Sequence, residues 1–114
     1  MAKRSSPPVL PSAPVDLLAV ASRGCEVILA WSERGVGVLG FHIERAVRTI
    51  SCSTFVEIGE VEPHVTAFRD GFVDLHAAYS YRIIAWNASG HSLPSNVVEV
   101  TMPPADTKAS FYKE

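Results

Sequence analysis

The chain has 114 residues, of which 47% are hydrophobic and 19% are charged, and its formal net charge is -2. This length and composition allow one globular domain with its own hydrophobic core and exclude a disordered, charge-rich chain. A net charge so close to zero gives no electrostatic basis for binding nucleic acid or an anionic membrane surface, so neither is expected as a partner.

No membrane anchor or secretion signal is visible in the sequence. The apolar runs are far shorter than the roughly 20 residues of a membrane-spanning helix, so direct membrane insertion is not expected. Residues 1–4, Met-Ala-Lys-Arg, are followed by serines and prolines instead of the apolar stretch of a signal peptide. A fragment of a longer secreted protein would lack that signal too, so the sequence leaves the compartment open.

Two cysteines, Cys25 and Cys52, are present. They are too few for a disulfide framework, and no Cys-x-x-Cys or Cys/His spacing indicates a zinc site. Each is interpreted as a buried free thiol. A single bridge between them is the alternative, and it would indicate an oxidising compartment.

The two ends of the chain differ in composition from its centre. Residues 1–14 hold four of the eight prolines, which favour an extended polyproline backbone. Residues 103–114 begin with Pro-Pro and then lose hydrophobic periodicity. We therefore expect a proline-rich linker over 1–12, one domain over 13–102 and a flexible tail over 103–114.

The first well-patterned strands lie in the centre of the chain, where β-branched and aromatic residues alternate with turn residues. Side chains in a strand alternate between two faces, so Cys25–Trp31 places an apolar stripe on one face, with Trp31 at its end. The stretch Phe41–Arg45 directs Phe41 and Ile43 inward, while His42 and Glu44 face water. The pattern predicts an all-β domain.

A third stripe lies near the C-terminal end of the domain. Its inward side is formed by Tyr79, Tyr81, Ile83 and Ala85, and its outward side by Ser80, Arg82, Ile84 and Trp86. The stretch 74–78 could form one turn of helix, which is too short to be stable alone. Weaker strand patterns cover four further segments: Leu17–Val20, Phe55–Val61, Val65–Arg69 and Val97–Thr101.

Several of these motifs together resemble a fibronectin type III domain over about residues 11 to 102. They are Pro-x-x-Pro-x-x-Leu from Pro11, "VILAW", "GFHIERA", and "FRDGFVDLHAAYSYRIIAWNASGHSLPSN", which ends in Ser-x-x-Ser. In this pattern Val73 takes the place of a leucine, six residues before the tyrosine, Tyr79. The resemblance implies a seven-stranded antiparallel Greek-key β-sandwich of the immunoglobulin-like kind.

The position of Tyr79 also has a direct physical interpretation. A tyrosine that enters a strand after a long corner can bury its ring while its hydroxyl bonds upstream backbone, which is the tyrosine-corner arrangement. We assign this role to Tyr79. The expected core is formed by Trp31, Phe41, Ile43, Tyr79 and Tyr81.

No catalytic or metal-binding pattern is recognised, so we expect neither an enzyme nor a cofactor. The histidines lie on separate segments and are not expected to converge as a metal site requires; they are His42, His64, His76 and His91. No serine or cysteine has a histidine at a recognisable spacing as its base. The pair Glu57 and Glu60 is interpreted as solvated residues on a short strand.

Asn87-Ala88-Ser89 matches an N-glycosylation sequon in an expected turn. The alternative for Asn87 is structural, because an asparagine amide can bond the turn backbone and tolerate left-handed conformations.

Two surfaces are candidates for binding a protein. The connections 32–39 and 88–93 are expected at one pole of the sandwich, where loops often carry recognition; no Arg-Gly-Asp is present, so integrin binding by that motif is not implied. The other candidate is an outward patch with an aromatic anchor. Its residues are Trp86, Ile84, Arg82, His42 and Glu44, with His91 in the adjoining turn. Alternatively, Trp86 is covered by the last strand or by the flanking tails, including Phe111 and Tyr112.

The resemblance implies a non-catalytic protein-interaction or spacer module within a larger multidomain protein, monomeric when isolated, with cell adhesion among the roles of such domains. The alternative is an accessory domain of a secreted or surface enzyme whose catalytic domain lies outside this chain. An extracellular or cell-surface location is favoured by the resemblance, and an intracellular one stays open.

Overall fold

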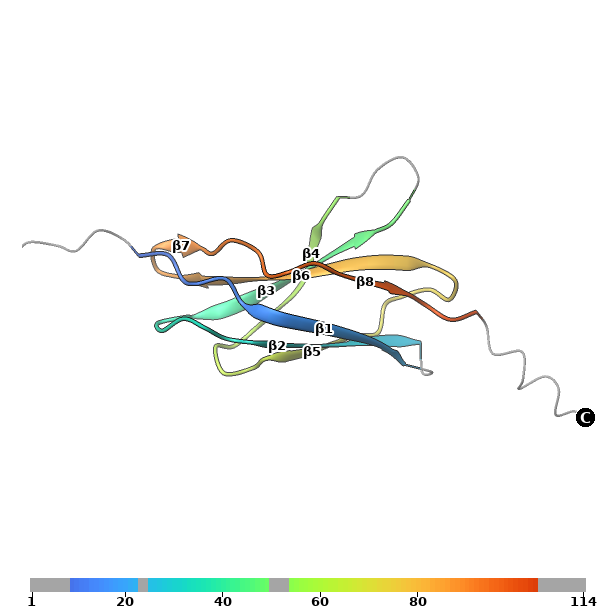
Figure 1. Ribbon diagram of the computed structural model, residues 1–114, viewed down its shortest axis with the longest axis horizontal. Coiled ribbons are helices and arrows are strands. Elements are labelled where there is room, and N and C mark those ends of the chain that lie inside the picture. Colours follow the sequence, from blue (N-terminus) through green and yellow to red (C-terminus); the bar gives the residue numbers. More distant parts are fainter. Residues whose placement is uncertain (1–8, 23–24, 50–53, 105–114) are drawn as a thin grey trace, which may run out of the picture.

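The computed structural model describes residues 9–22, 25–49 and 54–104, which form two antiparallel β-sheets packed face to face (Figure 1). One sheet has the strand order β1-β2-β5 and the other β4-β3-β6, with β7 and β8 both pairing with β6. The strands are β1 (Val15–Ser22), β2 (Glu26–Ser32), β3 (Gly40–Val47), β4 (Val56–Val61), β5 (Ala67–Asp70), β6 (Ala78–Asn87), β7 (Gly90–His91) and β8 (Val98–Thr101).

The expected all-β sandwich is therefore confirmed, and each expected strand is present with boundaries shifted by a few residues. The additional element is β7, two residues that pair with the end of β6 directly after the turn. The stretch 74–78 forms a turn and no helix. Within the described ranges, no helix is long and apolar enough to cross a membrane.

The core lies between the two sheets and is formed by the inward side of each strand. Trp31 and Phe41 meet edge to face with ring centroids 5.5 Å apart, a favourable geometry for aromatic pairs. The residues expected in the core are all buried, with at most 5% of their surface exposed: Trp31, Phe41, Ile43, Tyr79 and Tyr81.

The corner before β6 is held by Tyr79, as the sequence predicts. Its ring is buried, and its hydroxyl oxygen accepts a hydrogen bond of 2.8 Å from the backbone amide of Asp74, five residues upstream. Val73, in the leucine position, is buried beneath the same corner. The backbone of the long corner is thus tied to the strand that follows it.

The Ser-x-x-Ser segment, Ser92 to Ser95, runs along β6 by using its side chains. The hydroxyls of Ser92 and Ser95 accept hydrogen bonds from the backbone amides of Ala85 and Ile83, each at 2.9 Å. Buried backbone amides need such partners. The two serines therefore provide hydrogen-bond acceptors for the backbone amides of β6 that lie between its pairing with β7 and its pairing with β8.

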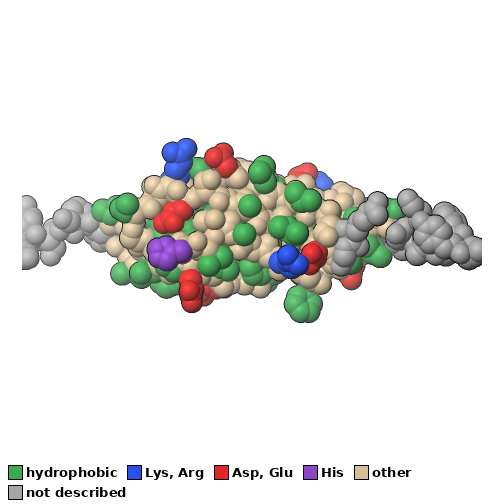
Figure 2. Space-filling view, turned by 90° about the horizontal axis from the view of Figure 1, so that it is seen from below, with side chains coloured by type: hydrophobic (Ala, Val, Ile, Leu, Met, Phe, Trp, Pro, Cys, Tyr) green, Lys and Arg blue, Asp and Glu red, His purple; other side chains and the backbone are tan. Residues whose placement is uncertain are grey.

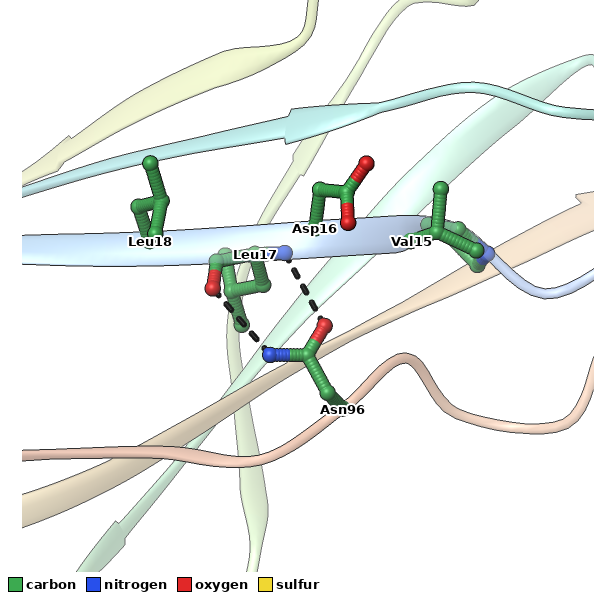
Figure 3. Close-up of a pocket in the computed structure, with 6 residues that line it drawn as sticks. Val15, Asp16, Leu17, Leu18 and Asn96 are labelled. Carbon is green, nitrogen blue, oxygen red and sulfur yellow. Dashed lines mark hydrogen bonds between the residues drawn. The ribbon is translucent and has the colours of Figure 1, made fainter.

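Asn96 joins the two sheets at their edge (Figure 3). Its Oδ1 accepts from the amide of Leu17 at 2.9 Å, and its Nδ2 donates to the carbonyl of the same residue at 3.1 Å. A bulge between Val15 and Leu18 opens a shallow hollow beside this pair, and the Asn96 amide lines it. We interpret the hollow as a consequence of the bulge and of the contact between Asn96 and Leu17.

The packed part of the chain extends to the N-terminal side of residue 13. Pro11 is buried, and the carbonyl of Val9 accepts a hydrogen bond from Asn87 Nδ2 at 3.0 Å. The described ends, near Val9 and Pro104, lie at opposite poles of the sandwich (Figure 1). The Cys25 thiol is half-buried and donates to the carbonyl of Val73 at 3.2 Å, whereas Cys52 and any bridge to it lie outside the described residues.

Candidate functional site

The outward side of the β4-β3-β6 sheet carries the residues predicted for protein contact. Strand pairing places Gly40 opposite Trp86, His42 opposite Ile84, and Glu44 opposite Arg82. Trp86 is also paired with His91 of β7. The register therefore brings six residues onto one surface, which we call the Trp86 face: His42, Glu44, Arg82, Ile84, Trp86 and His91.

Trp86 is half-buried, and its indole lies over Gly40 of β3. A Cβ atom at Gly40 would lie only 2.7 Å from its indole Nε1, so the absence of a side chain at Gly40 makes room for the ring. The His42 ring stacks beside it with centroids 6.0 Å apart. Phe111 and Tyr112, the tail residues that were considered as a cover for Trp86, lie outside the described residues.

Arg82 lies on the same outward side of β6, four residues before Trp86, and two contacts fix its side chain. Its Nε lies 2.6 Å from Oε1 of Glu44 on the neighbouring strand. Its guanidinium also sits over the ring of Phe55, 4.1 Å from the centroid, in the geometry of a cation–π interaction. The side chain is thus held in one orientation on a rigid sheet.

The expectation that the four histidines do not converge is wrong for two of them. His42 and His91 lie together on the Trp86 face, with ring centroids 5.2 Å apart. His64 and His76 are exposed in separate connections, as expected. The pairing of β6 with β7 was not predicted, and this short pairing carries His91 onto the sheet.

Glu57 and Glu60 also have a placement that the sequence did not indicate. Both carboxylates approach His42, whose Nδ1 lies 3.1 Å from Oε2 of Glu57 and 3.9 Å from Oε1 of Glu60. Although the shorter distance is within reach of a hydrogen bond, Nδ1 is buried and has no hydrogen-bond partner. About half of each carboxylate side chain is exposed.

A second polar cluster, inside the sandwich, was also missed. Asp70 is buried, and its Oδ2 accepts from the Tyr81 hydroxyl at 2.7 Å and from Arg45 at 2.8 Å. Burial, followed by the hydrogen bond to Asp70, raises the pKa of the Tyr81 phenol above its ordinary value. Burial lowers the pKa of the Arg45 guanidinium, but hydrogen bonding to Asp70 and the charge of that carboxylate raise it more. The cluster supports the corner, which indicates a structural role.

Asn87 caps the turn between β6 and β7. Its Oδ1 accepts from the amides of Ser89 and Gly90 at 2.8 and 3.2 Å, while its Nδ2 donates to Val9. These contacts support the structural interpretation of Asn87. Glycosylation at Nδ2 stays a prediction to be tested.

The outward face of the β1-β2-β5 sheet exposes apolar side chains that the sequence interpretation did not single out (Figure 2). Leu18 and Val20 on β1 are 67% and 61% exposed. Alternation could have found them, since Leu17 is buried and its neighbours must point the other way. Charged side chains also lie on this face (Figure 2). Arg69 of β5 and Glu26 of β2 form an ion pair at 3.3 Å.

The connections 32–39 and 88–93 lie at the same pole of the sandwich, as expected (Figure 1). The amide of Leu39 donates to the carbonyl of Trp86 at 2.8 Å, which joins the first of these connections to the end of β6. The loop pole is therefore continuous with the Trp86 face.

Comparisons with known proteins identify the fold. No protein-family model matches the chain, and no curated protein matches it. Among solved structures, the fibronectin type III domain of human fibronectin type III domain containing protein 3 is 26% identical, with a TM-score of 0.69, covering 94% of this chain and 98% of that one. The third fibronectin III domain of the human KIAA0343 protein is 11% identical, with a TM-score of 0.73 and 93% coverage of both chains. A Fn3-like protein from Clostridium thermocellum is 24% identical, with a TM-score of 0.66, covering 89% and 99%.

The structure is thus a fibronectin type III domain by fold, within the immunoglobulin-like β-sandwiches. The chain spans nearly all of these three single domains. It covers only about a third of longer neighbours, 32% of a titin fragment and 33% of a chicken CNTN1 fragment. Domains of this fold are generally non-catalytic modules that occur in multidomain proteins such as titin, contactin and twitchin.

Proposed function

We propose that this chain is a non-catalytic protein-interaction module of a larger protein, and that the Trp86 face is its contact surface. The observation that carries the proposal is the alternation and pairing of β6, which place Trp86 and an oriented arginine, Arg82, on the same outward side of one sheet, with Ile84 between them. Tryptophan and arginine are enriched among residues that dominate binding energy. Preorganisation adds to this, because side chains that are already fixed lose less entropy on binding.

The Trp86 face combines an apolar centre with polar margins. Ile84 and Trp86 form the centre, while Arg82 and Glu44 are paired with each other at one side. Contact surfaces of this kind need little rearrangement when a partner binds. We propose a folded protein or peptide as the partner, without nucleic acid or lipid, and a monomeric state for the isolated domain.

The positions of the chain ends support a place within a longer chain. Because the described ends lie at opposite poles, the domain can be inserted in line between neighbouring domains and also act as a spacer (Figure 1). The same fold occurs in cell-surface contactin and in intracellular titin. We propose an extracellular or cell-surface location, which the leader sequence of the parent protein would test.

A second candidate is an accessory domain that accompanies an enzyme. Two structural neighbours come from such surroundings, a structure of the titin kinase with its flanking domains and the twitchin kinase region. The parent open reading frame distinguishes the two candidates, since a catalytic domain in the same chain would favour the accessory role.

The contact surface can be tested with two matched substitutions on opposite sheets. Trp86→Ser removes the anchor, and Leu18→Ser removes an exposed apolar side chain from the other sheet. Proteins captured from the source organism by wild type and by each variant are compared by quantitative mass spectrometry. Binding of each purified candidate partner is then measured by calorimetry. We expect Trp86→Ser to weaken binding about 30-fold or more, since hot-spot residues contribute roughly 2 kcal/mol or more.

Circular dichroism must show that both variants stay folded. Loss of binding with Leu18→Ser but not with Trp86→Ser would move the contact surface to the β1-β2-β5 sheet and overturn the proposal. Unfolding of Trp86→Ser would show that the ring is structural, and Arg82→Ala would then test the same face without disturbing the indole. Undiminished binding by folded variants at both Trp86 and Arg82 would also refute it.

A further inference from the structure

We propose that His42, Glu57 and Glu60 form a binding site for a divalent transition-metal ion of the zinc type. One potential ligand atom from each residue, the His42 Nδ1 and one carboxylate oxygen from each glutamate, lies within 4.8 Å of the other two. An imidazole nitrogen combined with two carboxylate oxygens is a donor set that suits zinc and related ions. The site shares His42 with the Trp86 face, but it can be tested separately because the isolated chain can be titrated with metal alone.

The geometry requires only small movements to accept an ion. Tetrahedral coordination at 2.0 to 2.2 Å places ligand atoms roughly 3.3 to 3.6 Å apart. The two distances from His42 Nδ1 are 3.1 Å to Glu57 and 3.9 Å to Glu60, on either side of this value. Both carboxylates are about half-exposed, so their side chains are free to adjust and the fourth position is open to water.

A β-bulge brings both carboxylates to the same side of β4. Residues three apart on a regular strand point to opposite faces, so Glu57 and Glu60 would normally diverge. Here Ile43 pairs with Gly59 and Glu44 pairs with Glu57, so β4 has one extra residue, Ile58, at this point. Bulges re-aim side chains in this way and are frequent next to functional sites.

The state of His42 also points to a ligand. Its Nδ1 is buried and has no hydrogen-bond partner, which is costly for a polar ring atom unless something binds it. The ring is held in place by stacking against Trp86 and by a tilted contact with the His91 ring. A fixed imidazole whose free nitrogen faces two carboxylates is a preorganised ligand.

The charges around the site favour a cation. Glu44, the third carboxylate on this face, is neutralised by Arg82 at 2.6 Å. Among the described residues, the salt bridges of Glu57 and Glu60 are made with His42 alone. Two negative charges therefore converge on one imidazole, and a divalent cation would balance them.

The test is calorimetric titration of the 114-residue chain with Zn²⁺, with Mg²⁺ and Ca²⁺ as comparison ions. We expect one Zn²⁺ per chain and a rise in melting temperature of roughly 5 °C or more at saturation. Mg²⁺ and Ca²⁺ are expected to bind much more weakly, because they prefer oxygen ligands alone. Glu57→Gln, Glu60→Gln and His42→Gln should each lower the Zn²⁺ affinity about tenfold or more, since each removes a ligand.

Two matched controls retain the site. Glu62→Gln neutralises an exposed glutamate just beyond β4, and His64→Ala removes an exposed histidine from the next connection; neither should change the affinity. The two tryptophans give a second readout with paramagnetic Ni²⁺, which should broaden the indole resonance of Trp86, beside His42, before that of buried Trp31.

Three results would overturn the proposal. The first is the absence of Zn²⁺ binding by wild type at millimolar concentration, and the second is equal binding by wild type and the folded His42 and Glu57 variants. The third is equal affinity for Ca²⁺, which would exclude a transition-metal site. Failure of these tests would not contradict the protein-contact proposal, because that proposal is tested by a different measurement, the binding of a protein partner to Trp86→Ser.

Discussion

Replacing Asp70 by alanine should be one of the most destabilising single changes in the domain. Asp70 is 3% exposed, and it accepts hydrogen bonds from the Tyr81 hydroxyl, from Arg45 and from the amide of Phe72. Removing one partner of a buried ion pair costs about 3 to 5 kcal/mol, because the remaining charge is left without compensation. The Arg45 side chain is 20% exposed, so water can partly solvate it. We therefore expect a loss of about 3 kcal/mol, near the lower limit.

Such a loss is large against the roughly 5 to 15 kcal/mol that stabilise a domain of this size. Urea unfolding followed by tryptophan fluorescence gives the measurement. With a slope of roughly 1.5 kcal/mol/M, the midpoint should fall by about 2 M. Asp70→Asn keeps the shape and one acceptor oxygen for Tyr81, so it should lose less, about 1 to 3 kcal/mol.

The exposed Glu33 provides the control, since Glu33→Ala should change stability by no more than about 0.5 kcal/mol. A loss below about 1 kcal/mol for Asp70→Ala would refute the reasoning. It would mean that the buried network contributes no more than an exposed ion pair does.

Further predictions concern the pH dependence of stability, two buried aromatic residues and the sequon. Tyr81 keeps its proton in the folded state to a higher pH than its ordinary pKa of 10.0, so its stabilisation is complete below pH 10 and is lost as pH rises further. Above pH 10, the stability of wild type measured by urea unfolding should therefore fall more steeply than that of Tyr81→Phe, by up to about 1.4 kcal/mol per pH unit. Equal slopes for the two proteins would contradict this prediction. In the same assay Trp31→Ala should cost about 3 to 5 kcal/mol and Tyr79→Phe about 1 to 3 kcal/mol; wild-type stability in both would remove the core and corner assignments. Because Asn87 Nδ2 already donates to Val9, protein from a glycosylating host should keep its mass after glycosidase treatment, and a mass decrease would show that the sequon is used.

The placement of the strands and their inward sides could be predicted because these depend on local order along the chain. Because side chains alternate between the two sides of a strand, Tyr79 and Tyr81 point to the opposite side from Arg82 and Trp86, whichever strands lie beside it. Tyr79 was identifiable as the corner residue since its position after a long corner fixes both its burial and its bonding partner. These features need no knowledge of which strands are neighbours.

The polar clusters depended on contacts between segments that are distant in the sequence. Arg45 shares the inward side of β3 with Ile43, and a partly buried arginine is stabilised by a carboxylate. Asp70 supplies it from the other sheet, 25 residues away in the sequence. Nothing local to either residue indicates the other.

The same reason explains why the histidine cluster was missed. Glu57 and Glu60 face His42 together because a bulge in β4 changes the alternation, and a bulge exists only in relation to the strand beside it. His91 joins them through the short β7 pairing. The sequence by itself determined which apolar residues of the main strands this sandwich buries, since their burial follows a pattern within each strand. Only the tertiary structure decided which outward residues meet, because the register between strands sets those contacts.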